Sequence, residues 1–304
     1  MPQVAQLSAV PRAVPRLWAG GLELAARRMV DGLRAGRHRS PSLGPAAEFH
    51  DHRPYQAGDD LRRVDWRAFA RCDRLLLRRT REERDLPLVL VLDLSASMAY
   101  GEPEKDAWAR LAAATLATLA GDQGDRMRLA AGSITKGSES ALVWTDEGAG
   151  PGGALRLCAE LTRCTCAGAG AADTLLDTAV ARLRRRSLVV LLSDLLGDPL
   201  ALSRSAAQLA GRGHELAVIH VHDATEAALP AAWAQCQLTD PERPDSTRSV
   251  DAPAAQAGYA LAWAQHVQAL QMGLLAARAE LVSACTRHEV AQVLGGWLRR
   301  RARR

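Results

Sequence analysis

The stretch VLVLDLSASMAYGE, from Val89 to Glu102, ends an apolar run with a carboxylate and then places two serines at alternate positions. A second run, SLVVLLSDLLG, is also interrupted by an aspartate. Both runs stop well short of the roughly 20 apolar residues that a membrane helix needs. We therefore predict that each run is a buried β-strand, and that Asp93, Ser95 and Ser97 lie together in the loop after the first strand.

Apolar runs of this kind alternate along the chain with segments of helical periodicity. The patterns predict strands at 88–93, 127–134, 140–145, 187–193 and 215–221, and helices at 22–36, 104–120, 153–163, 174–185 and 200–211. Strands that are apolar on both faces and alternate with helices are typical of a mostly parallel sheet covered on both sides. The predicted fold class is α/β, with a doubly wound, Rossmann-like sheet.

The composition suits a cytoplasmic, folded protein. The 304 residues are 48% hydrophobic, the formal net charge is +5, and Lys105 and Lys136 are the only lysines among many arginines. We interpret the arginines as a solvated surface, so nucleic-acid binding is not expected. Prolines interrupt the N-terminal residues where a signal peptide needs an apolar core, and no membrane insertion is expected.

Four segments are predicted along the chain. They are an N-terminal arm and helix (1–36), a polar segment dense in alternating charge that packs on the core (37–86), the α/β domain (87–225) and a mainly helical C-terminal extension (226–304). The extension includes an amphipathic stretch from about 254 to 287 and a short terminal helix.

A doubly wound sheet binds ligands outside the carboxyl ends of its strands. Polar side chains are found in three loops predicted to lie there. They are Asp93, Ser95, Ser97, Thr174 and Asp194. Few carboxylates and several hydroxyls suit Mg²⁺ or Mn²⁺ better than Zn²⁺. The alternative is that these residues are helix N-caps, which Asp and Ser commonly form.

The DLSAS sequence resembles the D-x-S-x-S motif of von Willebrand factor A-type domains, which carry a metal-ion-dependent adhesion site. The resemblance implies that Asp93, Ser95, Ser97, Thr174 and Asp194 form the site. It also implies that the hydroxyls bind the metal directly, that the aspartates act largely through water, and that a partner's Asp or Glu supplies the last ligand.

The preceding segment is similar to the hallmark Y-x-x-G-D-D-x-R-x-x-D-W block of the bacterial family called domain of unknown function 58. The matching residues include Tyr55, Asp59, Asp60, Arg62, Asp65 and Trp66. This block could brace the domain or bind a partner. The resemblance implies a MoxR-type AAA+ ATPase as that partner.

The chain departs from the family pattern at three places. The second loop has AADT where a Gly-Gly-Thr is usual, Leu195 stands where glycine is common, and the C-terminal end looks shortened by a strand.

We predict a non-enzymatic, metal-dependent adaptor or co-chaperone that acts in complex assembly or metal insertion. The alternatives are a metal-dependent hydrolase or phosphotransferase on the same sheet, and a nucleic-acid-binding protein. A haloacid-dehalogenase-type phosphatase needs an aspartate at position 95, which is serine. Neither a Walker phosphate loop nor a G-x-S-x-G elbow is present. The HVH sequence at 220–222 lacks a nearby metal-site pattern, so we predict hydrogen-bonded or exposed histidines.

Overall fold

The computed structural model describes residues 21–37, 52–54, 69–70, 74–78, 86–133, 142–230 and 233–303. Contacts divide the chain into two compact units, residues 1–34 with 86–304 and residues 35–85. In the second unit, β1 (His52–Pro54) and β2 (Leu76–Arg78) pair antiparallel. The predicted arm at 1–20 and the hallmark residues Tyr55, Asp59, Asp60, Arg62, Asp65 and Trp66 lie outside the described residues.

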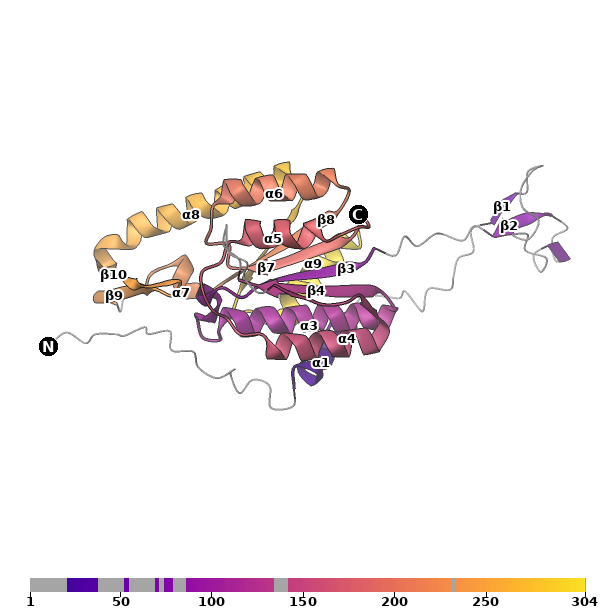
Figure 1. Ribbon diagram of the computed structural model, residues 1–304, viewed down its shortest axis with the longest axis horizontal. Coiled ribbons are helices and arrows are strands. Elements are labelled where there is room, and N and C mark those ends of the chain that lie inside the picture. Colours follow the sequence, from indigo (N-terminus) through magenta and orange to yellow (C-terminus); the bar gives the residue numbers. More distant parts are fainter. Residues whose placement is uncertain are drawn as a thin grey trace. The chain divides into compact units, whose positions relative to one another are not determined.

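A mostly parallel sheet forms the centre of the first unit (Figure 1). Its parallel strands lie in the order β11, β8, β7, β3, β4. They are β3 (Leu88–Asp93), β4 (Arg126–Gly132), β7 (Leu188–Ser193), β8 (Glu215–His222) and β11 (Glu280–Cys285). The short β5 (Val143–Trp144) and β6 (Gly148–Ala149) pair antiparallel with β4. The predicted α/β fold class is confirmed.

Both faces of this sheet are covered by helices, which explains why its strands are apolar throughout. All six residues of β3 are buried. Leu90 and Leu92 belong to one core cluster, and Val89 and Val91 to the other. The first cluster includes residues of α1 (Leu22–Arg37), α3 (Lys105–Gln123), α4 (Gly150–Arg163) and α9 (Val290–Arg301). The second includes residues of α5 (Ala172–Ala181), α6 (Pro199–Gly211) and α8 (Ala252–Ala276).

The strand order reverses beside β3. The chain runs from β3 to its neighbour β4 and later returns to β7 on the other side of β3. In open α/β sheets, the crevice at such a reversal, outside the carboxyl ends of the strands, is where ligands bind. The loops after β3 and β7 therefore lie next to each other at this crevice.

The C-terminal part contains more strand than the sequence predicts. A hairpin of β9 (Gln235–Asp240) and β10 (Arg243–Asp251) precedes α8. The predicted amphipathic stretch at 254–287 is two elements, because α8 ends at a turn in which Arg278 has a φ of 57°. After that turn, β11 pairs with β8, so the prediction of a missing strand is wrong. No helix in the described part of the chain is long and apolar enough to cross a membrane.

Candidate functional site at the carboxyl ends of β3 and β7

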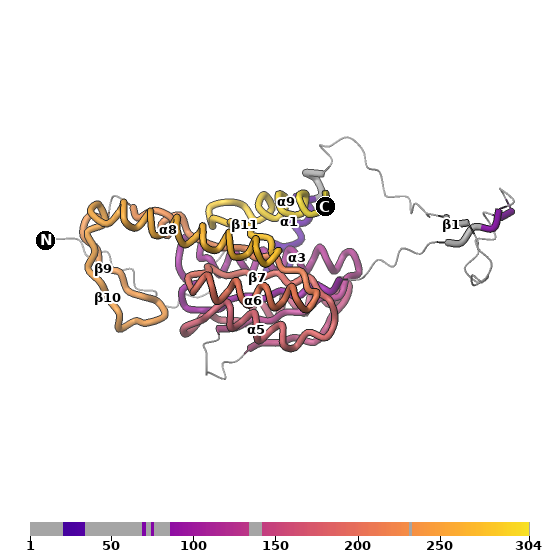
Figure 2. Tube along the Cα trace, turned by 90° about the horizontal axis from the view of Figure 1, so that it is seen from above, coloured from indigo at the N-terminus to yellow at the C-terminus, as the bar shows by residue number. Residues whose placement is uncertain are grey.

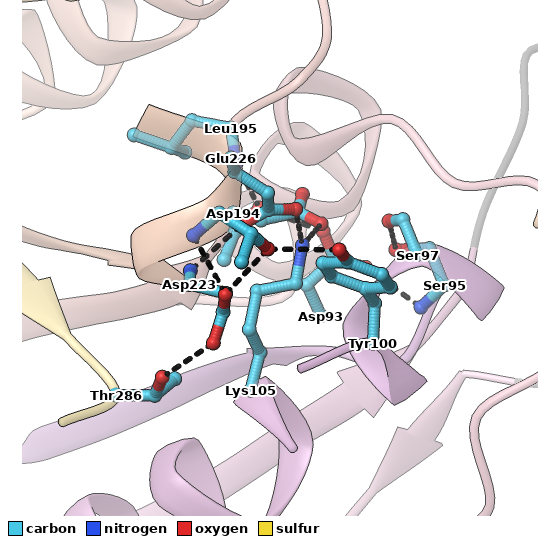
Figure 3. A network of polar contacts seen from close by, with 12 residues as sticks. Asp93, Ser95, Ser97, Tyr100, Lys105, Asp194, Leu195, Asp223, Glu226 and Thr286 are labelled. Carbon is cyan, nitrogen blue, oxygen red and sulfur yellow. Dashed lines mark hydrogen bonds and ion pairs between the residues drawn. The ribbon is translucent and has the colours of Figure 1, made fainter. Parts of the chain in front are cut away.

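Asp93, Ser95 and Ser97 converge in the turn that follows β3 (Figure 3). The Ser95 amide donates to Asp93 Oδ1 at 2.9 Å, and the hydroxyl oxygens of Ser95 and Ser97 lie 3.0 Å apart. The short 3-10 helix η3 (Ala96–Ala99) begins between the two serines and turns both hydroxyls to the same side. All three residues are at most 5% exposed. Three oxygen-bearing side chains are thus buried in a single turn.

The end of β7 holds the other side of Asp93. The Ser193 hydroxyl donates to Asp93 Oδ2 at 2.7 Å and accepts from the Leu195 amide at 3.0 Å. Leu195 has a φ of 53°, in the left-handed region that favours glycine. His266 on α8 stabilises this conformation, because its Nε2 lies 2.8 Å from the Leu195 carbonyl oxygen. The glycine that the family pattern favours is therefore replaced here by a strained leucine with two polar anchors.

Asp194, predicted as a ligand, is paired with a buried ammonium group. Lys105, at the start of α3, is 0% exposed, and its Nζ donates to Asp194 Oδ2 at 2.8 Å and to Glu226 Oε1. Figure 3 shows this ammonium between the two carboxylates, near the ring of Tyr100. Burial alone would lower the pKa of Lys105, but Asp194 and Glu226 outweigh it and raise the pKa. Asp194 thus has a fixed positive neighbour.

Glu226 is held in place by its own short helix. It lies in α7 (Ala224–Ala227), which begins with a capping box formed with Asp223. Its Oε2 accepts from the Asp223 amide at 2.8 Å, and the Tyr259 hydroxyl donates to its carbonyl oxygen. The Thr286 hydroxyl, just after β11, donates to Asp223. The ends of β3, β7, β8 and β11 all contribute to one polar network.

A fifth carboxylate reaches this network from the β9–β10 hairpin. The Ser97 hydroxyl donates to Glu242 Oε1 at 3.1 Å, and the Gly170 amide donates to Glu242 Oε2 at 3.4 Å. Sequence reasoning missed both Glu242 and Lys105. Lys105 carried one signal, since it is one of two lysines in an arginine-rich chain. Glu242 carried none, because its segment has the composition of a Pro-containing connection.

The electrostatics of the site are dominated by negative charge. Burial and the charge of Asp194 raise the pKa of Asp93 to about 6, against the lowering effect of hydrogen bonds from Ser193 and Ser95. Asp93, Asp194, Asp223, Glu226 and Glu242 are five carboxylates, and in the described part of the chain Lys105 is the one ammonium bonded among them. With all of them ionised, four negative charges stay uncompensated. A divalent cation would neutralise two of them.

Thr174 is not brought into hydrogen-bonding contact with the other predicted ligands. It is the third residue of α5, and its hydroxyl is buried without a hydrogen-bond partner in the described part of the chain. Gly170 is the residue of the second loop that approaches Asp93. A Cβ added at Gly170 would lie 2.8 Å from Ser95 Cβ and 3.3 Å from Asp93 Oδ1. The close approach of this backbone requires a glycine.

Backbone hydrogen bonds fix the second loop against the first. The Ala96 amide donates to the Gly168 carbonyl at 2.8 Å, and the Ala167 amide donates to the Leu94 carbonyl at 2.9 Å. The Ser133 hydroxyl at the end of β4 donates to the Ala169 carbonyl at 2.6 Å. The loop is therefore positioned by the backbone of two neighbouring strand ends.

The donor set fits a small divalent cation. Mg²⁺ prefers octahedral oxygen ligation at about 2.1 Å, which places adjacent ligands about 3.0 Å apart. The Ser95 and Ser97 hydroxyls have this spacing, and so do the Ser97 hydroxyl and Glu242 Oε1. Among the described residues, no group of three or more His, Cys, Asp or Glu could hold a metal ion. A cation at this site would therefore depend on the serine hydroxyls.

Histidines lie on the β8 side of the same network. The rings of His220 and His222 are 5.2 Å apart, and both contact the Trp263 ring of α8. His220 is not exposed: it is 2% exposed, and its Nε2 has no hydrogen-bond partner in the described part of the chain. Burial, with the neighbouring His222 and His266 and with Lys105, lowers the pKa of His220 to about 4 against the opposing charge of Asp194. This histidine is neutral at physiological pH.

Fold and site together define an α/β domain with a buried, hydroxyl- and carboxylate-rich cluster at the reversal point of a mostly parallel sheet. The chain belongs to the family described as "Protein of unknown function DUF58", which matches residues 51–269. It is 32% identical over 212 residues to the uncharacterized proteins Mb1516 of Mycobacterium bovis and Rv1480 of Mycobacterium tuberculosis. The match covers 69% of this chain and 65% of each relative.

Several solved structures are similar to the chain at low sequence identity. BatB of Bacteroides thetaiotaomicron is 13% identical, with a TM-score of 0.45, over 72% of this chain and 100% of the solved chain. The von Willebrand factor A domain of SpRpn10 is 13% identical, with a TM-score of 0.40, over 69% and 93% of the two chains. The manganese-loaded TRAP protein of Plasmodium vivax is 22% identical, with a TM-score of 0.32, over 44% and 56%. Similarity at this level supports no conclusion about function.

Proposed function

We propose that this chain is a non-enzymatic, cytoplasmic protein-interaction module that uses a divalent cation to bind a carboxylate of a partner. Mg²⁺ or Mn²⁺ would be held by Asp93, Ser95 and Ser97, with Asp194 and Thr174 completing the set. Because Asp194 is already paired with Lys105, its part is to supply charge and to orient water. Thr174, whose buried hydroxyl has no hydrogen-bond partner in the described part of the chain, would supply a further neutral oxygen.

The observation that carries this proposal is the pair of serine hydroxyls 3.0 Å apart beside a buried aspartate, inside a cluster with excess negative charge. Helix capping does not explain them. The N-cap residue of η3, Ser95, makes no side-chain cap hydrogen bond, and the side chain of Asp93 is engaged by Ser95 and Ser193.

The chemistry of the site favours binding over catalysis. A bound cation would supply a positive centre that attracts a carboxylate from another molecule. Ser95 and Ser97 offer neutral oxygens, which leave more of that positive charge available than carboxylate ligands would. Asp93 is oriented by Ser193 and by the Ser95 amide, so it is already placed for its role. The partner would then present an Asp or Glu on an exposed segment.

The metal role is tested by titrating the full chain with Mn²⁺ in a calorimeter. Asp93→Ala and Ser95→Ala should abolish the binding heat, because each removes an oxygen from the buried turn. Asp177→Ala is the matched control, since Asp177 is an exposed carboxylate on α5. Equal heats from the wild type and the Asp93 and Ser95 variants, or no heat from the wild type, would refute the proposal.

The finer part of the proposal is that the partner is a MoxR-type AAA+ ATPase, for which the chain acts as adaptor or co-chaperone in complex assembly or metal insertion. A tagged full chain should retain a MoxR-type ATPase, identified by mass spectrometry, in the presence of Mg²⁺. The ATPase should be lost on chelation and in the Ser95→Ala variant. Retention that is insensitive to both changes would exclude the metal-dependent role.

A further inference from the structure

The β9–β10 hairpin has little burial to hold it in place. All seven residues from Arg243 to Ser249 are exposed, and in β9 only Cys236 is buried. A two-stranded ribbon with so little buried surface is at best marginally stable by itself. Figure 2 shows the hairpin as an extension from the N-terminal end of α8, beyond the layers that cover the sheet. The position of this hairpin must depend on a small number of specific contacts.

Glu242, at the tip of the hairpin, makes such contacts. It is half-buried, and its two carboxylate oxygens accept from two different loops, through the Ser97 hydroxyl and the Gly170 amide. Asp240 shapes the turn, because its Oδ1 accepts from the Glu242 amide at 2.9 Å. The turn therefore directs one carboxylate into the crevice at the ends of β3 and β7.

This carboxylate enters a region that already holds an excess of negative charge. Asp194 repels Glu242, and the ammonium of Lys105 is bonded to Asp194 and Glu226 and not to Glu242. An anchor for an exposed hairpin would be more stable as an amide or a hydroxyl in such surroundings. A cation that shares the site would remove this repulsion and favour a carboxylate. The spacing of 3.1 Å between Glu242 Oε1 and the Ser97 hydroxyl is that of adjacent ligands of one small cation.

We propose that Glu242 is an internal ligand, which closes the cation site in the free chain and occupies the position that a partner's carboxylate takes in the complex. This inference rests on the proposed function. The hairpin then acts as a latch, and a partner binds by displacing Glu242. The partner's side chain is accordingly an Asp or Glu on a segment slim enough to replace the tip of a two-stranded ribbon.

The test compares two variants of the full chain that each remove one negative charge from the same hairpin. Glu242→Gln removes the proposed ligand, and Asp245→Asn is the matched control, since Asp245 is exposed. Loss of an anionic group that contacts a metal site typically lowers affinity by on the order of tenfold or more. We expect Glu242→Gln to weaken Mn²⁺ binding by about that factor, and Asp245→Asn to leave it within about twofold. Equal affinities for the two variants, or tighter binding by Glu242→Gln, would overturn the proposal.

A small carboxylate provides the second measurement. Glu242→Ala leaves space where the Glu242 carboxylate was. Millimolar acetate, which carries the same group, should enter this space and restore Mn²⁺ affinity in this variant. Acetate should have no such effect on Asp245→Asn, which also corrects for acetate binding to free Mn²⁺. Absence of rescue, with Asp93-dependent Mn²⁺ binding intact in the wild type, would refute the latch while leaving the proposed function in place. If the wild-type chain did not bind Mn²⁺ at all, the proposed function itself would be refuted.

Hydrogen exchange tests the latch without any metal. The Gly170 amide donates to the Glu242 side chain, so Glu242→Ala, which removes the acceptor, should speed exchange at this amide and across residues 235–251. Asp245→Asn should leave both rates unchanged. Identical exchange in the two variants would mean that Glu242 does not hold the hairpin, and the proposal would fail.

Discussion

Replacing Lys105 by methionine should destabilise the first unit more than any other single change at the site. Methionine has a similar length but no charge, so Asp194 and Glu226 would lose the one ammonium that they contact among the described residues. Lys105 is 0% exposed, and water cannot take its place without rearrangement. Removing one partner of a buried ion pair costs about 3–5 kcal/mol, because the remaining charge stays buried and unpaired. We expect a loss of this size in the free energy of unfolding at pH 7.

Urea unfolding followed by far-ultraviolet circular dichroism measures this loss, provided that the slope with urea is unchanged between variants. Arg163→Met is the control, because Arg163 forms an exposed helical ion pair with Glu160. That variant should lose well under about 1 kcal/mol. Adding Glu226→Gln to Lys105→Met should recover part of the loss, because it removes one of the stranded charges. A loss below about 1 kcal/mol for Lys105→Met would refute the argument that this ammonium is buried and paired.

Three further changes test other parts of the network. The lowered pKa of His220, about 4 against 6.5, means that the unfolded chain binds a proton more readily, so stability is fully present above pH 6.5 and falls as the pH decreases toward 4. The free energy of unfolding lost over this pH range is about 3 kcal/mol. In urea unfolding at several pH values, His220→Gln should make the free energy of unfolding depend less on pH. An unchanged pH dependence would contradict the lowered pKa of His220. Gly170→Ala should destabilise by about 1–3 kcal/mol in the same assay and weaken Mn²⁺ binding in a calorimeter, because the new Cβ would clash with Ser95. Wild-type stability in that variant would show that the second loop can move aside. Asp223→Ala should cost about 1–2 kcal/mol of unfolding free energy, because it removes the cap of α7 and the acceptor of the Thr286 hydroxyl. A loss of unfolding free energy no larger than that of Asp177→Ala would show that Asp223 does not stabilise α7 and the Thr286 contact.

The sequence was informative where one strong local signal decides the structure. The apolar runs before Asp93 and Asp194 predicted β3 and β7 closely, because a strand buried on both faces leaves a continuous apolar pattern. The alternate spacing of Ser95 and Ser97 predicted that they share a turn. The side of Asp93 that Ser193 occupies was not predictable, because that contact depends on the register of β3 against β7.

The sequence was uninformative where a contact joins distant segments. Glu242 lies 145 residues from the serine that it contacts, and the hairpin that carries it has no apolar periodicity. Strand β11 is an edge strand of six residues directly after a long helix, so its pattern merged with that of α8. The position of Thr174 depends on where α5 begins. The structure starts this helix at Ala172, before the threonine and not at it, and no side chain caps that start.

Helix α8 connects the β9–β10 hairpin to the amino end of β11. Its 25 residues amount to about 37 Å of rigid rod. It starts at the hairpin, packs along α6, and ends at the turn that leads into β11. A displacement of the hairpin must therefore either bend the chain at Asp251 or push the whole rod toward Arg278, whose left-handed backbone leaves little room for adjustment. A movement of the β9–β10 hairpin can therefore be transmitted along α8 to the turn that leads into β11.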